Sequence, residues 1–147
     1  MNLVDAFHYS KYKLLKISLK FLKRRYIVYR SNYGFKLNLR LDRSVDRRII
    51  TRKFENDNIE LFKKVVKNSD CVIDIGANIG VYSLIASSLV SEEGIIYSFE
   101  PSVNIFKELN NNIKLNDIKN VKTYNLVSVI KMVSPIIIFV KTTPIIL

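Results

Sequence analysis

The chain has few of the residues that build cross-links and metal centres. Its 147 residues include one cysteine, Cys71, and one histidine, His8. A single cysteine excludes a disulfide within the chain and fits a reducing, cytoplasmic compartment. A zinc centre takes about four ligands, most of them cysteine or histidine, so we expect no metal site.

Negative charge is scarce in the N-terminal part. Residues 1–53 hold 15 lysines and arginines against 3 acids (+12), whereas residues 54–147 hold 9 against 10 (−1). This asymmetry is compatible with nucleic acid, an anionic membrane, an acidic substrate or simply a solvated face. We expect no signal peptide, because the N-terminus lacks an apolar core followed by a small-residue cleavage site. Residues 10–30 contain a basic amphipathic helix that could meet an anionic membrane surface, so we also consider a membrane-peripheral location.

Hydrophobic spacing divides the chain into three parts: a basic N-terminal extension (1–53), a central domain (54–126) and an apolar tail (127–147). In the extension it predicts a helix over 10–25, a short hairpin with strands at 26–30 and 35–41, and a second helix within 42–53. In the central domain it predicts helices over 57–67, 79–89 and 102–116 and strands over 70–75, 95–99 and 120–126. The alternation of strand and helix predicts a parallel sheet. The tail offers one further strand, at 136–140.

The chain has only four glycines, and two of them, Gly76 and Gly80, lie in the segment DIGANIG. This segment follows the strand expected over 70–75, and ligands of open parallel sheets bind beyond the carboxyl ends of the strands. Gly76 permits a positive φ and a close approach of the backbone. Gly80 would let the next helix pack closely against the strand or a ligand. The spacing G-x-x-x-G matches neither the dinucleotide fingerprint nor the phosphate-binding loop.

Two carboxylates flank this loop. Glu100 ends the second strand, and a carboxylate there can accept hydrogen bonds from both hydroxyls of a ribose. Asp74, at the end of the first strand, can face a cationic amino-acid group, which S-adenosyl-L-methionine has and NAD lacks. The combination favours a nucleoside cofactor over a purely structural turn, and S-adenosyl-L-methionine over NAD.

The segments DIGANIGVYSLIAS, IIYSFEPS and LNNNIKLNDIKNVKTYN resemble the FkbM-type methyltransferases. That family shows a D-x-G-A-N-x-G-x-x-S loop, an F-E-P turn and an N-x-x-L-N helix end. The match extends from about Tyr33 to Asn125.

The resemblance implies an α/β, Rossmann-like methyltransferase fold and O-methylation of a sugar, glycolipid or similar small-molecule or glycan hydroxyl. It implies that Glu100 holds the cofactor ribose, and it leaves the catalytic base unassigned. Ser83 and Tyr82 match the family too, although the first turn of a packed helix explains them equally well. The residues implied around the methionine part of the cofactor are Asp74, Gly76, Ala77, Asn78 and Gly80.

The chain departs from the family after about residue 126, where further strands and an acidic motif should follow. We therefore expect an incomplete fold, limited to the first three parallel strands and their helices, and weak or no activity. Residues 129–133 read Val-Ile-Lys-Met-Val, and a shifted reading frame permits the family's Asp-Lys-Asp-Gly there, because ATG followed by GT contains the glycine codon GGT. We interpret the tail as a truncation or frameshift product, with a natural short homologue as the alternative.

A different class of function stays open: a basic module that binds nucleic acid or a membrane surface without catalysis. Nucleic acid is the weaker expectation, since no RNA-binding motif is evident and the N-terminal aromatic residues fit a core better than a stacking surface.

Overall fold

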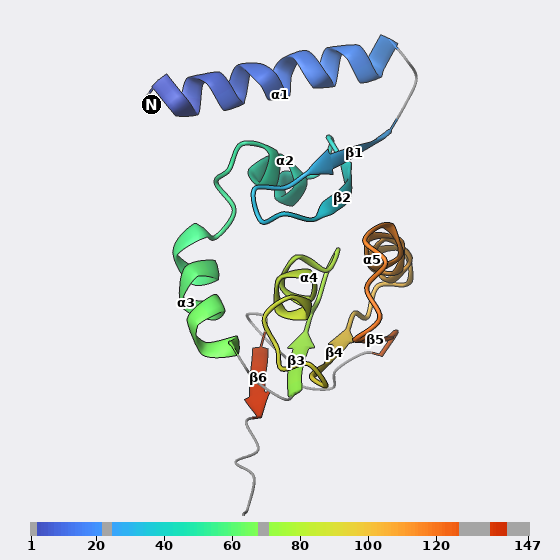
Figure 1. Cartoon of the computed structure of the whole chain (residues 1–147). Coiled ribbons are helices and arrows are strands. Elements are labelled where there is room, and N and C mark those ends of the chain that lie inside the picture. The colour runs from blue at the N-terminus through green and yellow to red at the C-terminus, as the bar shows by residue number, and fades with distance from the viewer. Residues whose placement is uncertain (1–2, 22–24, 68–70, 127–135, 141–147) are drawn as a thin grey trace, which may run out of the picture. The chain divides into compact units, whose positions relative to one another are not determined.

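The computed structural model describes residues 3–21, 25–67, 71–126 and 136–140 (Figure 1). They belong to two compact units, Met1–Asn56 and Asp57–Leu147. Within the described ranges, no helix is both long and apolar enough to cross a membrane. Residues 127–135 and 141–147 lie outside the described residues, and so does the segment 129–133 on which the frameshift interpretation rests.

A β-hairpin forms the centre of the first unit. Its strands β1 (Tyr26–Arg30) and β2 (Lys36–Arg40) pair antiparallel, which confirms the expected hairpin. Gly34 closes the turn with a φ of 96°, a backbone conformation that glycine adopts without a side-chain penalty. Leu37 and Leu39 of β2 are fully buried, so one side of the hairpin faces the core of this unit.

Two helices complete the first unit: α1 (Leu3–Phe21) and α2 (Ser44–Ile50). α2 contacts both α1 and β2. The Tyr12 hydroxyl of α1 donates a hydrogen bond to the Leu41 carbonyl at 2.9 Å, in a buried position. α1 begins well before the expected start at residue 10. Each residue added to a formed helix gains a backbone hydrogen bond, and no glycine or proline between residues 3 and 21 interrupts it.

The second unit is a mostly parallel sheet with crossover helices, which confirms the α/β fold. Strands β3, β4 and β5 run parallel in the order β5-β4-β3, and β6 completes that row beside β3. The bounds of its elements are α3 (Asn56–Val66), β3 (Cys71–Ile75), α4 (Val81–Ser87), β4 (Ile95–Phe99), α5 (Val103–Leu115), β5 (Val121–Tyr124) and β6 (Ile136–Val140).

β6 lies where a doubly wound sheet reverses its strand order. In a fully parallel sheet of this class, the strand at this position runs parallel to its neighbour. Here β6 runs antiparallel to β3, as Figure 1 shows. β6 confirms the strand expected at 136–140. Its pairing also covers an edge of β3 that would otherwise present unpaired backbone groups.

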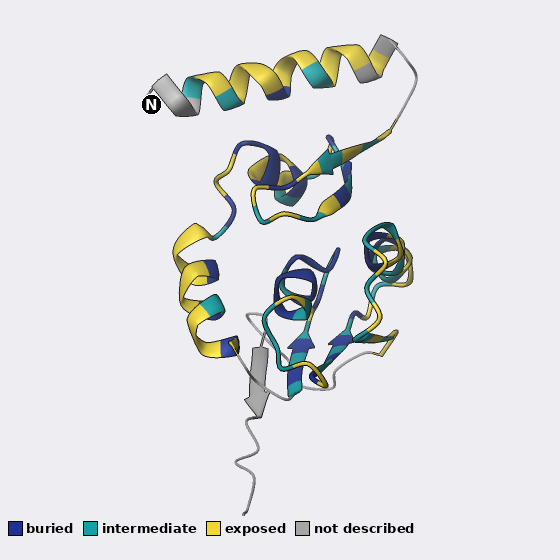
Figure 2. Cartoon of the chain, in the orientation of Figure 1, coloured by how far each residue is buried: buried dark blue, intermediate teal, exposed yellow. Residues whose placement is uncertain are grey.

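One face of the sheet is more deeply buried than the other. Along β3 and β4, buried residues alternate with half-buried ones (Figure 2). The buried row includes Val72 and Ile96, as expected for a core, but also the polar residues Asp74 and Ser98. Polar groups are costly to bury unless they are hydrogen-bonded, so we expect both side chains to have hydrogen-bonding partners in the core.

Candidate functional site

A loop of residues 76–80 joins the carboxyl end of β3 to α4. Its backbone has a positive φ at Gly76 (80°), Asn78 (52°) and Gly80 (91°). No atom outside the chain neighbours lies within 4 Å of the position that a Cβ on Gly76 would take. Gly76 therefore serves the backbone conformation, as predicted, and leaves open space beside its Cα.

Gly80 has a different reason to be glycine. A Cβ at this position would lie 2.6 Å from Cδ1 of Leu109, which is fully buried on α5. The close packing at Gly80 is therefore with α5. The loop is held against the helix that follows β4.

The loop is also bound to the end of β4. The Phe99 carbonyl accepts hydrogen bonds from the N–H groups of Gly76 and Ala77, both at 2.9 Å. The next residue, Glu100, accepts the Asn78 N–H on Oε2 at 3.0 Å and the Ser102 N–H on Oε1 at 2.9 Å.

Glu100 itself is nearly buried, with 6% exposure. Four of the sequence-predicted residues, Gly76, Ala77, Asn78 and Glu100, thus meet at one edge of the sheet. The Asn78 side chain bonds locally, since its Oδ1 accepts the neighbouring Ile79 N–H at 2.8 Å.

Asp74 lies beneath this loop in a buried polar cluster. The Ser83 hydroxyl of α4 donates to Asp74 Oδ2 at 2.6 Å and lies 2.7 Å from the Ser98 hydroxyl of β4. All three residues are at most 2% exposed. Burial raises the pKa of Asp74 from 3.8 to about 6; the hydrogen bonds from Ser83 oppose this shift and the nearby negative charge of Glu100 adds to it.

Sequence reasoning missed three contributors to the site. Ser98 belongs to the Asp74 cluster, Asn112 Nδ2 donates to the Ile79 carbonyl at 2.8 Å, and Asn125 Nδ2 donates to the Glu100 carbonyl at 2.8 Å. A signal was present for two of them, since Ser98 lies at an inward strand position and Asn112 begins the N-x-x-L-N motif on the buried face of α5. Asn125 follows β5 and carries no comparable pattern.

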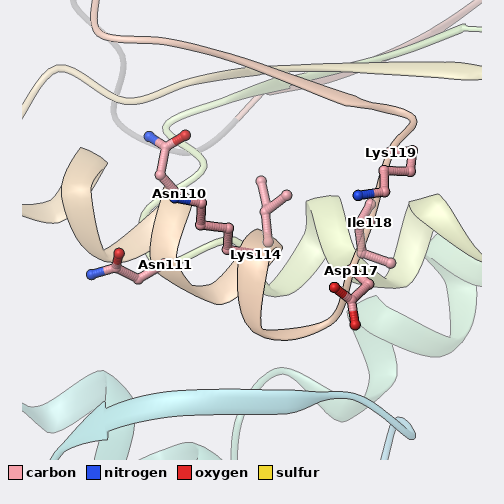
Figure 3. A pocket seen from close by; sticks show the side chains of 7 residues that line it. Asn110, Asn111, Lys114, Asp117, Ile118 and Lys119 are labelled. Atoms are coloured by element: carbon pink, nitrogen blue, oxygen red, sulfur yellow. The ribbon is translucent and has the colours of Figure 1, made fainter.

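A cavity of about 260 Å³ is lined by residues of α5 and of the turn that follows it, and Figure 3 shows these residues. It lies along the C-terminal half of α5 and the turn after it. Asn110, on its wall, already accepts a hydrogen bond from Thr123 at 2.8 Å. Its other lining residues are Asn111, Ile113, Lys114, Asp117, Ile118 and Lys119.

The described part of the second unit has an α/β fold with three parallel strands, and this fold matches solved structures of Rossmann-like methyltransferases. One is TYW2 from P. horikoshii in complex with MeSAdo, with a TM-score of 0.52 and 20% identity over 79% of this chain and 47% of that one.

TYW2 from M. jannaschii in complex with AdoMet has a TM-score of 0.50 and 21% identity over 68% of this chain and 42% of that one. Trm5b from Pyrococcus abyssi has a TM-score of 0.50 and 21% identity over 67% of this chain and 27% of that one. No protein-family model and no curated protein matches the chain. At these identities the likeness shows the fold, and the chain spans less than half the length of each of the three proteins.

Proposed function

We propose that this chain carries the cofactor-binding part of an S-adenosyl-L-methionine-dependent methyltransferase. The observation that carries the proposal is the convergence of the glycine loop, Asp74 and Glu100 at the carboxyl ends of β3 and β4. Ligands of open α/β sheets bind at this edge, next to the point where the strand order reverses. We also propose residues 54–126 as the cofactor domain, 1–53 as an extension and 127–147 as a tail.

Glu100 is the residue that we assign to the cofactor ribose. Its carboxylate is held by the N–H groups of Asn78 and Ser102, which fix its orientation before any ligand binds. A carboxylate has about four acceptor positions, so two remain for a pair of ribose hydroxyls. The open space beside Gly76 would let the ligand approach the backbone of the loop.

Asp74 is the residue that we assign to the amino-acid end of the cofactor, which would lie along Gly76, Ala77, Asn78 and Gly80. An ammonium group close to a buried carboxylate favours its charged form and lowers its pKa. Burial raises the pKa of unliganded Asp74 to about 6, so an arriving cation would release a proton near that pH. The affinity for the cofactor product should therefore rise as the pH increases through about 6.

The reaction that we propose is methylation of a hydroxyl in the FkbM manner, on a sugar, glycolipid or similar acceptor. Residues of two FkbM-family motifs form hydrogen bonds in or next to the glycine loop. Ser83, the last residue of D-x-G-A-N-x-G-x-x-S, donates to Asp74, the first. Asn112, the first residue of N-x-x-L-N, holds the Ile79 carbonyl. These contacts support the resemblance, and the single cysteine supports a cytoplasmic location.

In such a reaction the acceptor oxygen attacks the methyl carbon in line with the carbon–sulfur bond. That bond breaks, sulfur keeps the electron pair as a thioether in S-adenosylhomocysteine, and a base takes the hydroxyl proton. What this chain contributes is the positioning of the cofactor by the loop and by Glu100.

Calorimetric titration with two ligands tests these assignments. S-adenosylhomocysteine has both the ribose and the amino-acid end, whereas methylthioadenosine lacks the amino-acid end. We expect Glu100→Gln to weaken both ligands about 10- to 100-fold, as for the loss of a charged hydrogen bond. Asp74→Asn should weaken S-adenosylhomocysteine alone.

Glu93→Gln, an exposed carboxylate in the turn before β4, is the matched control and should change neither affinity. Folded wild-type protein that binds neither ligand would contradict the proposal. Equal binding by Glu100→Gln and wild type would contradict the ribose assignment alone.

A further inference from the structure

Helix α1 has an exposed apolar stripe that the cofactor site does not use. Phe7, Leu14 and Ile17 are 66%, 66% and 55% exposed. At 100° per residue their side chains fall within an arc of about 80° on one side of the helix. The buried Tyr12, whose hydroxyl donates to the Leu41 carbonyl, points to roughly the opposite side. α1 is thus attached to its own unit by one face and presents apolar side chains on another.

The stripe is bordered by positive charge. Lys11 and Lys13 are exposed, and each falls about 40° beyond one edge of the apolar arc. Lys20 continues the side of Lys13, so both long edges of the stripe carry an ammonium group. Residues 3–21 hold four lysines and a single acid, Asp5.

We propose that α1 lies flat on an anionic lipid surface, with Phe7, Leu14 and Ile17 entering the boundary between headgroups and acyl chains. Apolar side chains flanked by lysines are the composition of interfacial helices, and anionic headgroups attract the flanking ammonium groups. This proposal does not depend on methyl transfer. It replaces the membrane contact expected over residues 10–30 by a contact through one face of α1.

A second copy of the chain is a less suitable occupant of the stripe. Pairing two α1 helices along this face would place the lysines that border each stripe against one another, because their charges have the same sign on every copy. Like charges across an interface cost free energy, whereas an anionic membrane neutralises them. Charge complementarity therefore favours the lipid surface.

Vesicle sedimentation with the full chain tests this assignment. We compare vesicles of phosphatidylcholine alone with vesicles containing about one third phosphatidylglycerol. The wild type should sediment with the anionic vesicles and be released as salt is added. The double variant Lys11→Gln/Lys13→Gln should lower the partition coefficient about five-fold per lysine. Phe7→Ser/Leu14→Ser/Ile17→Ser should lower it at least ten-fold.

The matched control lies on α3, whose Leu61 and Val65 are 63% and 48% exposed at helical spacing. Leu61→Ser/Val65→Ser should bind the vesicles as the wild type does, and circular dichroism checks that every variant is folded. Three results would overturn the proposal: no wild-type binding to anionic vesicles, equal binding to both kinds of vesicle, or loss of binding in the α3 control. A concentration-dependent dimer abolished by the α1 stripe variant, without vesicle binding, would assign the stripe to a second copy instead.

Discussion

Replacement of Gly80 by alanine tests how the glycine loop is packed. The new Cβ would lie 2.6 Å from Cδ1 of the fully buried Leu109, about 1 Å closer than ordinary van der Waals contact between carbon atoms. Overpacking of this kind costs about 1–3 kcal/mol. The φ of 91° at Gly80 adds about 1–2 kcal/mol for any residue with a Cβ.

We therefore expect Gly80→Ala to lower the free energy of unfolding by about 2–5 kcal/mol. Gly76→Ala is the matched control, because Gly76 also has a positive φ, 80°, but nothing within 4 Å of its Cβ position. It should cost only the conformational part, about 1–2 kcal/mol. Urea unfolding followed by circular dichroism measures both, and an unchanged m-value shows that the folded and unfolded states remain comparable.

A double-mutant cycle isolates the contact. Leu109→Ala removes Cδ1, so adding Gly80→Ala in that background should cost only the conformational part, about 1–2 kcal/mol. If Gly80→Ala is as mild as Gly76→Ala in the wild type, or equally damaging in both backgrounds, then the packing of the loop against α5 is not what requires glycine at position 80.

Three further substitutions test the buried polar groups. The pKa of Asp74 is about 6 in the folded chain against its ordinary 3.8, so the folded state holds the proton more tightly than the unfolded state. As the pH rises from about 4 to 6, the free energy of unfolding of the wild type should therefore fall by at most roughly 3 kcal/mol. Urea unfolding of Asp74→Asn at each pH should not show this pH dependence. An equal change of the free energy of unfolding with pH in the wild type and in Asp74→Asn would refute the burial argument. Asn112→Ala leaves the buried Ile79 carbonyl without the donor at 2.8 Å and should cost about 1–3 kcal/mol while weakening S-adenosylhomocysteine; a stability loss with unchanged affinity would mean that this contact does not shape the loop. Asp46→Ala removes a fully buried carboxylate that accepts the Arg40 N–H and the Arg43 guanidinium and should cost about 3–5 kcal/mol. Asp42→Ala, in the exposed pair with Arg40, should change the free energy of unfolding by less than about 1 kcal/mol. Similar thermal unfolding of Asp46→Ala and Asp42→Ala would contradict this expectation.

Local patterns were sufficient to place the elements of the second unit. The β-branched runs at β3 and β4 and the apolar spacing of α5 predicted their type and their ends to within a few residues, because burial of one face imposes a period on the sequence. The position of Glu100 opposite the glycine loop also followed, since the ends of adjacent parallel strands lie at one edge of the sheet. The start of α1 was placed too late, because the helix extends before residue 10 and no glycine or proline there interrupts it.

The sequence by itself determined the parallel α/β topology, the loop between β3 and α4 and the identity of its acidic partners, since each depends on short-range periodicity. Only the tertiary structure decided that Gly80 faces Leu109, that Ser83 and Ser98 enclose Asp74, and that β6 runs antiparallel to β3. An apolar run such as β6 contains no information on its direction or its neighbour. Contacts between residues on different elements depend on how helices and strands pack, and no local pattern specifies that packing.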